Sequence, residues 1–227
     1  MISFILLSGG SGARMNKPIP KQYLLLAGKP VIIHILERID DIAEISEVII
    51  VCHERYRDLL STYISAYMLR KKIVFANAGT TRQESVYNGL QKVNTKLVIL
   101  HEAARPFVKK SDFETLIHDE NENITYGIDI PFTVLKTNNH YISGNLKRDE
   151  LINIQLPQKF NASSLLQGHQ MAIADKLVFT EDASLLFHYG LGAVKVVKGQ
   201  PYNIKLTEPM DLLLGEIIYK EFFAGRD

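Results

Sequence analysis

Short, continuously apolar runs alternate with helix-length segments along this chain, and this alternation constrains the fold more than any other feature. Runs such as "VIIVC" and "LVILH" carry no polar face, as expected for strands covered on both sides of a sheet. Strands that alternate with helices indicate parallel pairing in an α/β layer architecture. We therefore expect an α/β fold with a mostly parallel central sheet and helices on both faces. The expected strands are Ser3–Ser8, Glu47–Cys52, Ile73–Ala76 and Leu97–His101.

Five segments between and after these strands have helical patterns. Ser111, followed by Asp112 and Glu114, is interpreted as an N-cap with acidic residues in the first turn. Pro209 suits the first turn of the last helix. The expected helices are Pro30–Ile39, Arg55–Tyr67, Arg82–Val93, Ser111–Glu120 and Pro209–Phe222.

The segment at about 132–156 breaks this pattern. Two short β-like runs flank the turn-rich stretch "KTNNHYISGN", and neither helical nor parallel-sheet patterning persists. An exposed hairpin of this length seeks a partner to cover it. We expect a β-arm that projects from a single domain spanning residues 1–227 and that serves dimerisation.

Charge and cysteine content exclude several classes of protein. Lysine and arginine number 26 against 25 aspartate and glutamate, a net charge of +1, so no broad basic surface for nucleic acid is expected. Cys52 is the only cysteine, which excludes an intramolecular disulfide, and its apolar surroundings indicate a buried structural thiol. The N-terminus lacks the basic region of a signal peptide and no apolar stretch approaches about 20 residues. We expect a cytoplasmic protein that binds neither membrane nor nucleic acid.

A glycine-rich loop, "LLSGGSGARMNKPIPKQYL", follows the first strand. Met15 stands where a dinucleotide-binding fingerprint needs its third glycine or alanine, and Pro18 and Pro20 interrupt the helix that would follow. The loop also lacks the lysine and serine or threonine pair of a P-loop. Arg14 and Lys21 follow at short spacing instead. Backbone amides from Ser8, Gly9, Gly10, Ser11 and Gly12, together with these two cations, are suited to a triphosphate.

Four ordered motifs make the chain recognisable: "GGSGARM…PIPKQYL", "GTTRQESVYNGL", "HEAARPF" and "YNIKLTEPMDL". Together they resemble the family of 2-C-methyl-D-erythritol 4-phosphate cytidylyltransferases over nearly the whole chain. Ribitol-5-phosphate cytidylyltransferases share these motifs. The resemblance implies a Rossmann-like nucleotidyltransferase fold and a homodimer formed through the β-arm. It also implies transfer of CMP from CTP to a polyol phosphate of the non-mevalonate isoprenoid pathway, with release of pyrophosphate.

The resemblance also implies roles for individual residues. Arg14 and Lys21 correspond to catalytic cations that clamp the triphosphate. Glu102 follows a strand at a position where the family more often has aspartate, and it is a candidate either for a ligand of Mg²⁺, which commonly binds one carboxylate plus substrate phosphates, or for a contact of the ribose. Arg148 and Lys205 correspond to the cations that bind the acceptor phosphate, the former reaching into the partner subunit's site. The positions that correspond to CTP-binding residues are Ser8, Gly9, Gly10, Ser11, Gly12, Gly79, Arg82, Ser85 and Ala103.

Other polar residues near the motifs have less specific interpretations. His101 is interpreted as a strand-end residue without chemistry. Arg105 is interpreted as structural or as lying near the substrate phosphate. Asp182, in "TEDASLL", is interpreted as a helix cap in preference to a substrate contact.

Two departures from the family pattern concern the acceptor. Leu156 precedes Pro157 where the family has threonine, and Val134 stands near another threonine position that Thr133 could fill after a shift of one residue. Loss of these hydroxyls would weaken a polar subsite. The alternatives are a cytidylyltransferase for ribitol 5-phosphate or another polyol phosphate, and a non-catalytic nucleotide-binding relative.

Overall fold

The computed structural model describes residues 1–15 and 17–225. A central seven-stranded sheet has the order β11-β7-β10-β6-β1-β4-β5, and the pairs β1–β4, β1–β6, β4–β5 and β7–β11 are parallel. β10 is antiparallel to both β6 and β7, so the mostly parallel sheet expected from the sequence is confirmed. The strands are β1 (Ile2–Leu7), β4 (Ile45–Cys52), β5 (Lys72–Asn77), β6 (Leu97–Glu102), β7 (Ile124–Asp129), β10 (Ile152–Asn161) and β11 (Lys195–Lys198).

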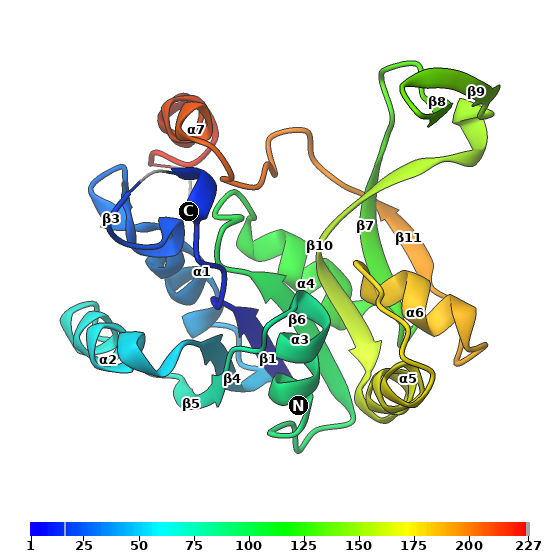
Figure 1. The fold of residues 1–227 in the computed structure, drawn as a ribbon. Coiled ribbons are helices and arrows are strands. Elements are labelled where there is room, and N and C mark those ends of the chain that lie inside the picture. The colour runs from blue at the N-terminus through cyan, green and yellow to red at the C-terminus, as the bar shows by residue number, and fades with distance from the viewer. Residues whose placement is uncertain (16, 226–227) are drawn as a thin grey trace.

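Helices cover both faces of this sheet (Figure 1). Successive side chains of a strand point to opposite faces, and β1 shows why its run is apolar throughout. Phe4 and Leu6 pack in one core cluster with α1 and α4, whereas Ile5 and Leu7 pack in another with α3, α5 and α6. The helices are α1 (Val31–Asp40), α2 (Arg57–Ala66), α3 (Arg82–Leu90), α4 (Lys110–His118), α5 (Ala162–Ala174), α6 (Asp182–His188) and α7 (Pro209–Phe222).

Two helix N-caps predicted from the sequence are wrong, because each helix is capped one or two residues earlier. α4 begins at Lys110, not Ser111, because the Asp112 carboxylate accepts a hydrogen bond from the Lys109 backbone N–H at 2.8 Å and closes the first turn there. α6 is capped by Glu181, whose side chain accepts from the Asp182 N–H at 3.0 Å. Asp182 is therefore not the cap, and its carboxylate is free for other contacts.

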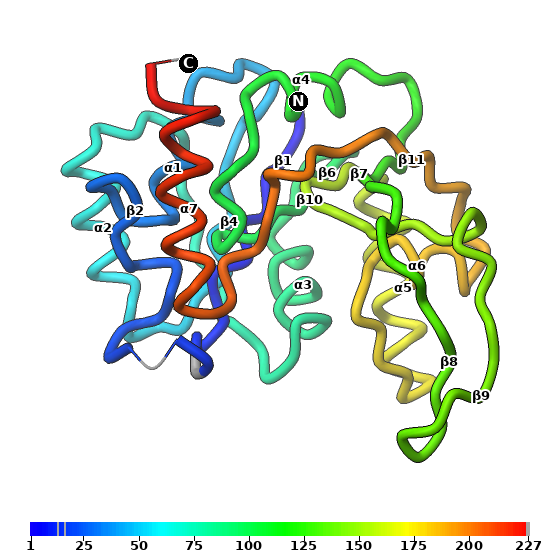
Figure 2. The backbone as a smooth tube through the Cα atoms, turned by 90° about the horizontal axis from the view of Figure 1, so that it is seen from above, coloured from blue at the N-terminus to red at the C-terminus, as the bar shows by residue number. Residues whose placement is uncertain are grey.

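A hairpin of β8 (Leu135–Asn138) and β9 (Tyr141–Asn145) extends away from the central sheet (Figures 1 and 2). Its turn is only Asn139 and His140, whose positive φ values of 47° and 68° are those of a tight hairpin turn. The stretch read from the sequence as turn-rich thus contains most of both strands. At the other end, residues 152–156 belong to β10 in the central sheet and not to the arm.

Shorter elements complete the chain. The hairpin β2 (Leu25–Leu26) and β3 (Lys29–Pro30) leads into α1, and α7 packs over it in a core cluster that includes Leu26, Phe107 and Ile218. The 3-10 turns are Ala13–Met15, Lys21–Tyr23, Glu54–Tyr56 and Arg148–Glu150. Within the described residues, none of the helices combines the length and hydrophobicity needed to cross a membrane.

Candidate active site

A cavity of about 490 Å³ lies at the carboxyl ends of the parallel strands, where open α/β sheets bind ligands. Its walls come from the loop after β1, the turn before α3, the end of β6 and the segment before α7. Four cationic side chains and a single carboxylate line it within the described residues. Most of the predicted site residues meet here: Ser8, Gly9, Gly10, Ser11, Gly12, Arg14, Lys21, Gly79, Arg82, Ser85, Glu102 and Lys205.

The glycine loop is held against the segment that follows it. Gly12 has a φ of +69°, and a Cβ at this position would lie 3.0 Å from the Lys21 backbone nitrogen. This close approach brings Lys21 back beside the glycine turn. The Gln22 side-chain amide donates to the carbonyls of Ser8 at 2.7 Å and Gly10 at 3.0 Å. Gln22, which the sequence did not single out, therefore turns these carbonyls away from the face that an anion would approach.

Ser8 differs from the prediction in one respect. Its backbone N–H donates to the Val51 carbonyl at 2.8 Å, as the last contact of the β1–β4 ladder, and is not available to a phosphate. Its hydroxyl lies 3.3 Å from the Tyr23 hydroxyl and helps to fix the loop. The backbone N–H groups of the loop that remain candidates for an anion are thus those that come after Ser8.

Lys21 is buried, with 8% of its surface exposed. Burial, reinforced by the neighbouring charges of Lys205 and Arg14, lowers the pKa of Lys21 from 10.5 to about 8. The side chain is still charged at neutral pH, yet it has little water around it and like charges nearby. An anion bound in the cavity would relieve this unfavourable arrangement, which makes the position well suited to a polyphosphate.

The turn before α3 forms the opposite wall. Thr81 caps the helix by accepting from the Glu84 N–H at 3.0 Å, and Glu84 accepts from the Thr80 N–H at 2.7 Å. The Ser85 hydroxyl donates to the Thr81 carbonyl at 2.9 Å and accepts from the Gly79 N–H at 3.0 Å. Ser85 therefore holds the turn in shape, and the helix N-terminus it supports faces the cavity.

Glu102, at the end of β6, is the carboxylate of the cavity. It is 7% exposed and forms ion pairs with Lys205 at 2.7 Å, Arg82 at 3.3 Å and Arg105 at 3.8 Å. Burial by itself raises the pKa of Glu102, but the charges of Lys205 and Arg82 outweigh it and lower the pKa to about 2. Glu102 is consequently ionised over the whole range in which a protein of this kind is studied.

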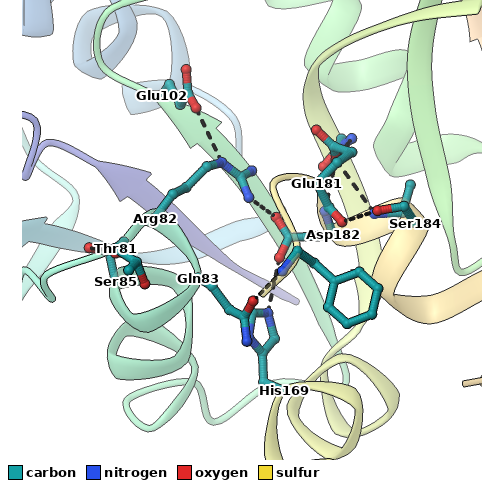
Figure 3. Close-up of polar contacts among 12 residues, drawn as sticks. Thr81, Arg82, Gln83, Ser85, Glu102, His169, Glu181, Asp182 and Ser184 are labelled. Atoms are coloured by element: carbon teal, nitrogen blue, oxygen red, sulfur yellow. Dashed lines mark hydrogen bonds and ion pairs between the residues drawn. The ribbon is translucent and has the colours of Figure 1, made fainter. Parts of the chain in front are cut away.

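Arg82 is half-buried and paired with carboxylates. It extends from the first turn of α3 and lies between two carboxylates, Glu102 on β6 and Asp182 on α6 (Figure 3). Asp182 in turn contacts His169 of α5 at 3.0 Å. Local sequence patterns contain no signal for this link, because its members lie far apart along the chain.

Of the remaining residues of the "HEAARP" motif, Ala104 lines the cavity, whereas His101, Ala103 and Arg105 do not. The Ala103 N–H donates to the Leu7 carbonyl at 3.0 Å, so this N–H is not available to CTP, and Ala103 does not line the cavity. His101 is fully buried, its Nε2 lies 2.9 Å from the Arg105 carbonyl, and burial lowers its pKa to about 4. The interpretation of His101 as a residue without chemistry agrees with this neutral, enclosed state. Arg105 donates to the Asn203 carbonyl at 3.1 Å and does not line the cavity.

Arg148 is not brought into this cavity within a single chain. It is exposed on the 3-10 turn after β9 and lines a second, smaller cavity of about 340 Å³ with Asp129 and Asp149. Lys205, its predicted companion for the acceptor phosphate, lines the main cavity instead.

The two positions that depart from the family pattern lie outside the main cavity. Leu156 is 3% exposed and packs in the core cluster beneath α3 and α5, while its carbonyl accepts from the Asn203 side chain at 2.6 Å. Val134 lies at the base of the arm, one residue before β8. Neither residue lines the main cavity. Sequence reasoning also missed His53, Thr80, Thr81 and Thr207, which do line it.

The cysteine behaves as expected. Cys52, the last residue of β4, is fully buried and unpaired, and burial raises the pKa of its thiol.

Comparisons with known proteins agree on one family. The sequence model described as "IspD: 2-C-methyl-D-erythritol 4-phosphate cytidylyltransferase" matches residues 2–221. A chloroplastic 2-C-methyl-D-erythritol 4-phosphate cytidylyltransferase of Oryza sativa subsp. japonica is 36% identical over 225 residues, covering 97% of this chain and 75% of the relative. An enzyme of the same description from Geobacillus thermodenitrificans is 34% identical, covering 94% and 95%. The crystal structure of 4-diphosphocytidyl-2C-methyl-D-erythritol synthase from Anaerococcus prevotii superposes with a TM-score of 0.85 at 27% identity, covering 96% of each chain.

Proposed function

The chain belongs to the 2-C-methyl-D-erythritol 4-phosphate cytidylyltransferase family, and on that premise we propose that its main cavity transfers CMP from CTP to 2-C-methyl-D-erythritol 4-phosphate. The observation that carries the proposal is the grouping of Arg14, Lys21, Arg82 and Lys205 around a glycine-rich loop, with Glu102 as the one described carboxylate. Such an excess of cations suits a ligand with several negative charges. Binding of a base alone would not require it.

In the proposed reaction an oxygen of the acceptor phosphate attacks the α-phosphorus of CTP in line. The new P–O bond forms as the bond from the α-phosphorus to the bridging oxygen breaks, and that oxygen leaves as part of pyrophosphate. Catalysis of this kind is chiefly positioning and charge stabilisation. Arg14 and Lys21 clamp the triphosphate and stabilise the charge that develops on it. The amides of residues 9–12 contribute further donors to the same oxygens.

On the nucleotide side, the turn of residues 79–81 and Arg82 hold the cytidine. On the acceptor side, Lys205 binds the phosphate that attacks. Lys205 contacts Glu102 at 2.7 Å, and its ammonium group has further N–H donors with which to bind an acceptor phosphate.

We also propose Mg²⁺ as the cofactor, with Glu102 as its one protein ligand. Glu102 is ionised, and its buried Oε2 accepts no well-directed hydrogen bond within residues 1–15 and 17–225 although Lys205 lies close by. No cluster of three or more potential ligand side chains exists in that part of the chain, so substrate oxygens would supply the other ligands, as is common for Mg²⁺. The ion would neutralise charge on the triphosphate.

One assay tests the reaction and the acceptor together. Pyrophosphate release is measured with CTP and Mg²⁺ in the presence of 2-C-methyl-D-erythritol 4-phosphate or ribitol 5-phosphate. Turnover with the first alone supports the proposal, and turnover with ribitol 5-phosphate alone would replace the acceptor. Tight CTP binding with no turnover on either would indicate a non-catalytic relative. Glu102→Gln should raise the Mg²⁺ concentration needed for half-maximal rate, and an unchanged requirement would remove Glu102 from the metal site.

We propose further that two copies pair through the arm, so that Arg148 serves the partner subunit's cavity. Phe132, Tyr141 and Ile142 on and beside the hairpin are 70–79% exposed, an apolar surface that a second copy would cover. Lys21→Ala and Arg148→Ala are each expected to be nearly inactive. A mixture of equal amounts, allowed to exchange subunits, should recover about a quarter of wild-type activity, because half of the dimers are mixed and each has one intact site. No recovery, with mixed dimers shown to form, would place Arg148 in its own chain's site. An Arg148→Ala protein with wild-type activity would place Arg148 outside catalysis.

A further inference from the structure

Arg82 is anchored at two of its three guanidinium nitrogens. Nε lies 3.3 Å from Glu102 Oε1 and Nη1 lies 2.7 Å from Asp182 Oδ2. The third nitrogen, Nη2, is buried and has no hydrogen-bond partner among the described residues, although Arg82 lines the cavity. An unsatisfied buried donor of a charged group is costly unless a ligand completes it. Nη2 is therefore the donor that Arg82 keeps for a ligand.

The two anchors of Arg82 differ in kind. Glu102 lines the cavity and is shared with Lys205, so substrate or metal binding changes its contacts. Asp182 is 2% exposed and does not line the cavity, so a bound substrate would not contact it. Asp182 is thus the anchor that stays in place when the contacts of Glu102 change.

Asp182 is fixed by a residue from a further element. Its Oδ1 lies 3.0 Å from Nε2 of His169, which is fully buried on α5 (Figure 3). The Asp182 backbone N–H is held by the Glu181 cap. The resulting chain of contacts runs from α5 through α6 to α3 and ends at the cavity.

We propose that Asp182 and His169 are positioning residues for Arg82, which hold its guanidinium so that Nη2 meets the bound nucleotide. This inference rests on the proposed role of Arg82 in CTP binding. If the contact between His169 and Asp182 only joined α5 to α6, Asp182 would not also need to pair with an arginine of the cavity wall. Nor would such a contact leave that arginine with one buried donor unused.

The test measures CTP affinity by calorimetry together with steady-state kinetics. Asp182→Asn keeps the shape of the side chain and removes its charge. We expect the Kd for CTP to rise about tenfold. In metal sites, loss of a residue that orients a ligand costs about 10–100-fold in affinity, and we take the lower end of that range. KM for the acceptor should stay within about twofold of wild type, because Arg82 does not serve that subsite. His169→Gln retains a donor near the Nε2 position and should preserve CTP affinity, whereas His169→Leu should lose part of it.

Glu181→Gln is the matched control. Glu181 is a neighbouring, half-buried carboxylate that caps the same helix and contacts Gln158 at 2.6 Å. Its charge acts on Arg82 from a distance, but among the described residues it forms no ion pair with Arg82 within 4.0 Å. Its replacement should lower thermal stability while leaving the affinity for CTP within about twofold of wild type. The control therefore distinguishes destabilisation of α6 from loss of the contact that positions Arg82. Where Asp182→Asn fails to fold, the two His169 variants provide the same comparison.

A double-mutant cycle gives the decisive comparison. In an Arg82→Gln background, Asp182→Asn should weaken CTP binding no further, because the residue it positions is gone. An undiminished effect in that background, or an Asp182→Asn protein that binds CTP like wild type, would overturn the inference. Failure of the wild-type protein to bind CTP would instead overturn the proposed function.

Discussion

Replacing Lys21 by methionine is expected to make the protein more stable and far less active. The two side chains are similar in length, so the change chiefly removes a charge. In the folded protein that charge is buried and is repelled by Lys205 and Arg14, while Glu102 is the carboxylate that offsets this repulsion most. The free enzyme therefore carries an electrostatic cost at Lys21 that methionine does not have.

The size of this cost follows from the pKa of Lys21. A decrease from 10.5 to about 8 means that folding disfavours the charged form. At about 1.4 kcal/mol per unit the decrease corresponds to roughly 3 kcal/mol, and water in the open cavity reduces it to about 1–3 kcal/mol. Because the folded pKa lies below the unfolded one, this destabilisation is complete below about pH 8 and fades as the pH rises toward 10.5.

The cost to activity should be larger. A cation in a cavity with little water stabilises developing phosphate charge strongly, and loss of one such donor typically lowers kcat by about 10²–10³-fold. We expect Lys21→Met to lower kcat by this amount. KM for the acceptor should change little, because Lys21 is assigned to the triphosphate.

Two measurements check this reasoning. Urea unfolding at pH 7 and at pH 10 gives the free energy of unfolding of both proteins, and pyrophosphate release gives kcat. The variant should be more stable at pH 7, and its advantage should shrink at pH 10. A variant that is less stable at pH 7, or one that keeps wild-type kcat, would refute the account of Lys21 as a strained cation held for catalysis.

Three further outcomes are expected. In the wild-type enzyme kcat/KM for CTP should fall as the pH rises through about 8, because Lys21 of the free enzyme loses its proton there. Lys21→Arg should abolish this fall. A flat pH profile in the wild-type enzyme would contradict the titration of Lys21. Gly9→Ala should lower the melting temperature, because its Cβ would lie 2.5 Å from the Ala78 Cβ, whereas Gly10→Ala, with nothing within 4 Å, should melt like wild type; equal melting temperatures for the two variants would count against the packing. Cys52 should resist iodoacetamide until the protein is unfolded, since burial encloses the thiol and raises its pKa; rapid labelling of the native protein would show that β4 is accessible.

Much of the first half of the fold could be predicted from local pattern. The strand expected at Glu47–Cys52 is β4, two residues longer at its start, and the helix expected at Pro209–Phe222 is α7 with the same bounds. Both succeed because a strand buried on two faces is apolar throughout, and because proline marks a helix start. β11 was not predicted, since "KVVK" is a short, partly exposed edge strand with almost no apolar signal.

The errors come from polar side chains with more than one possible partner. Asp182 looked like a helix cap because acidic residues near a helix start commonly are caps. Glu181, one residue earlier, takes that role, and Asp182 turns to Arg82 and His169. The choice between two adjacent carboxylates depends on where α3 and α5 lie, which no local pattern contains.

The sequence by itself determined the layer order of the fold and the presence of a glycine-rich loop that carries its own cations. Apolar periodicity and glycine and proline positions are local properties, so they can be read without knowing what lies opposite. Only the tertiary structure decided that Gly12 packs on Lys21, that Gln22 holds the loop's carbonyls, and that Arg82 lies between two carboxylates. These contacts join residues through space, and the burial that sets the pKa of Lys21 and Glu102 exists only once the chain has folded.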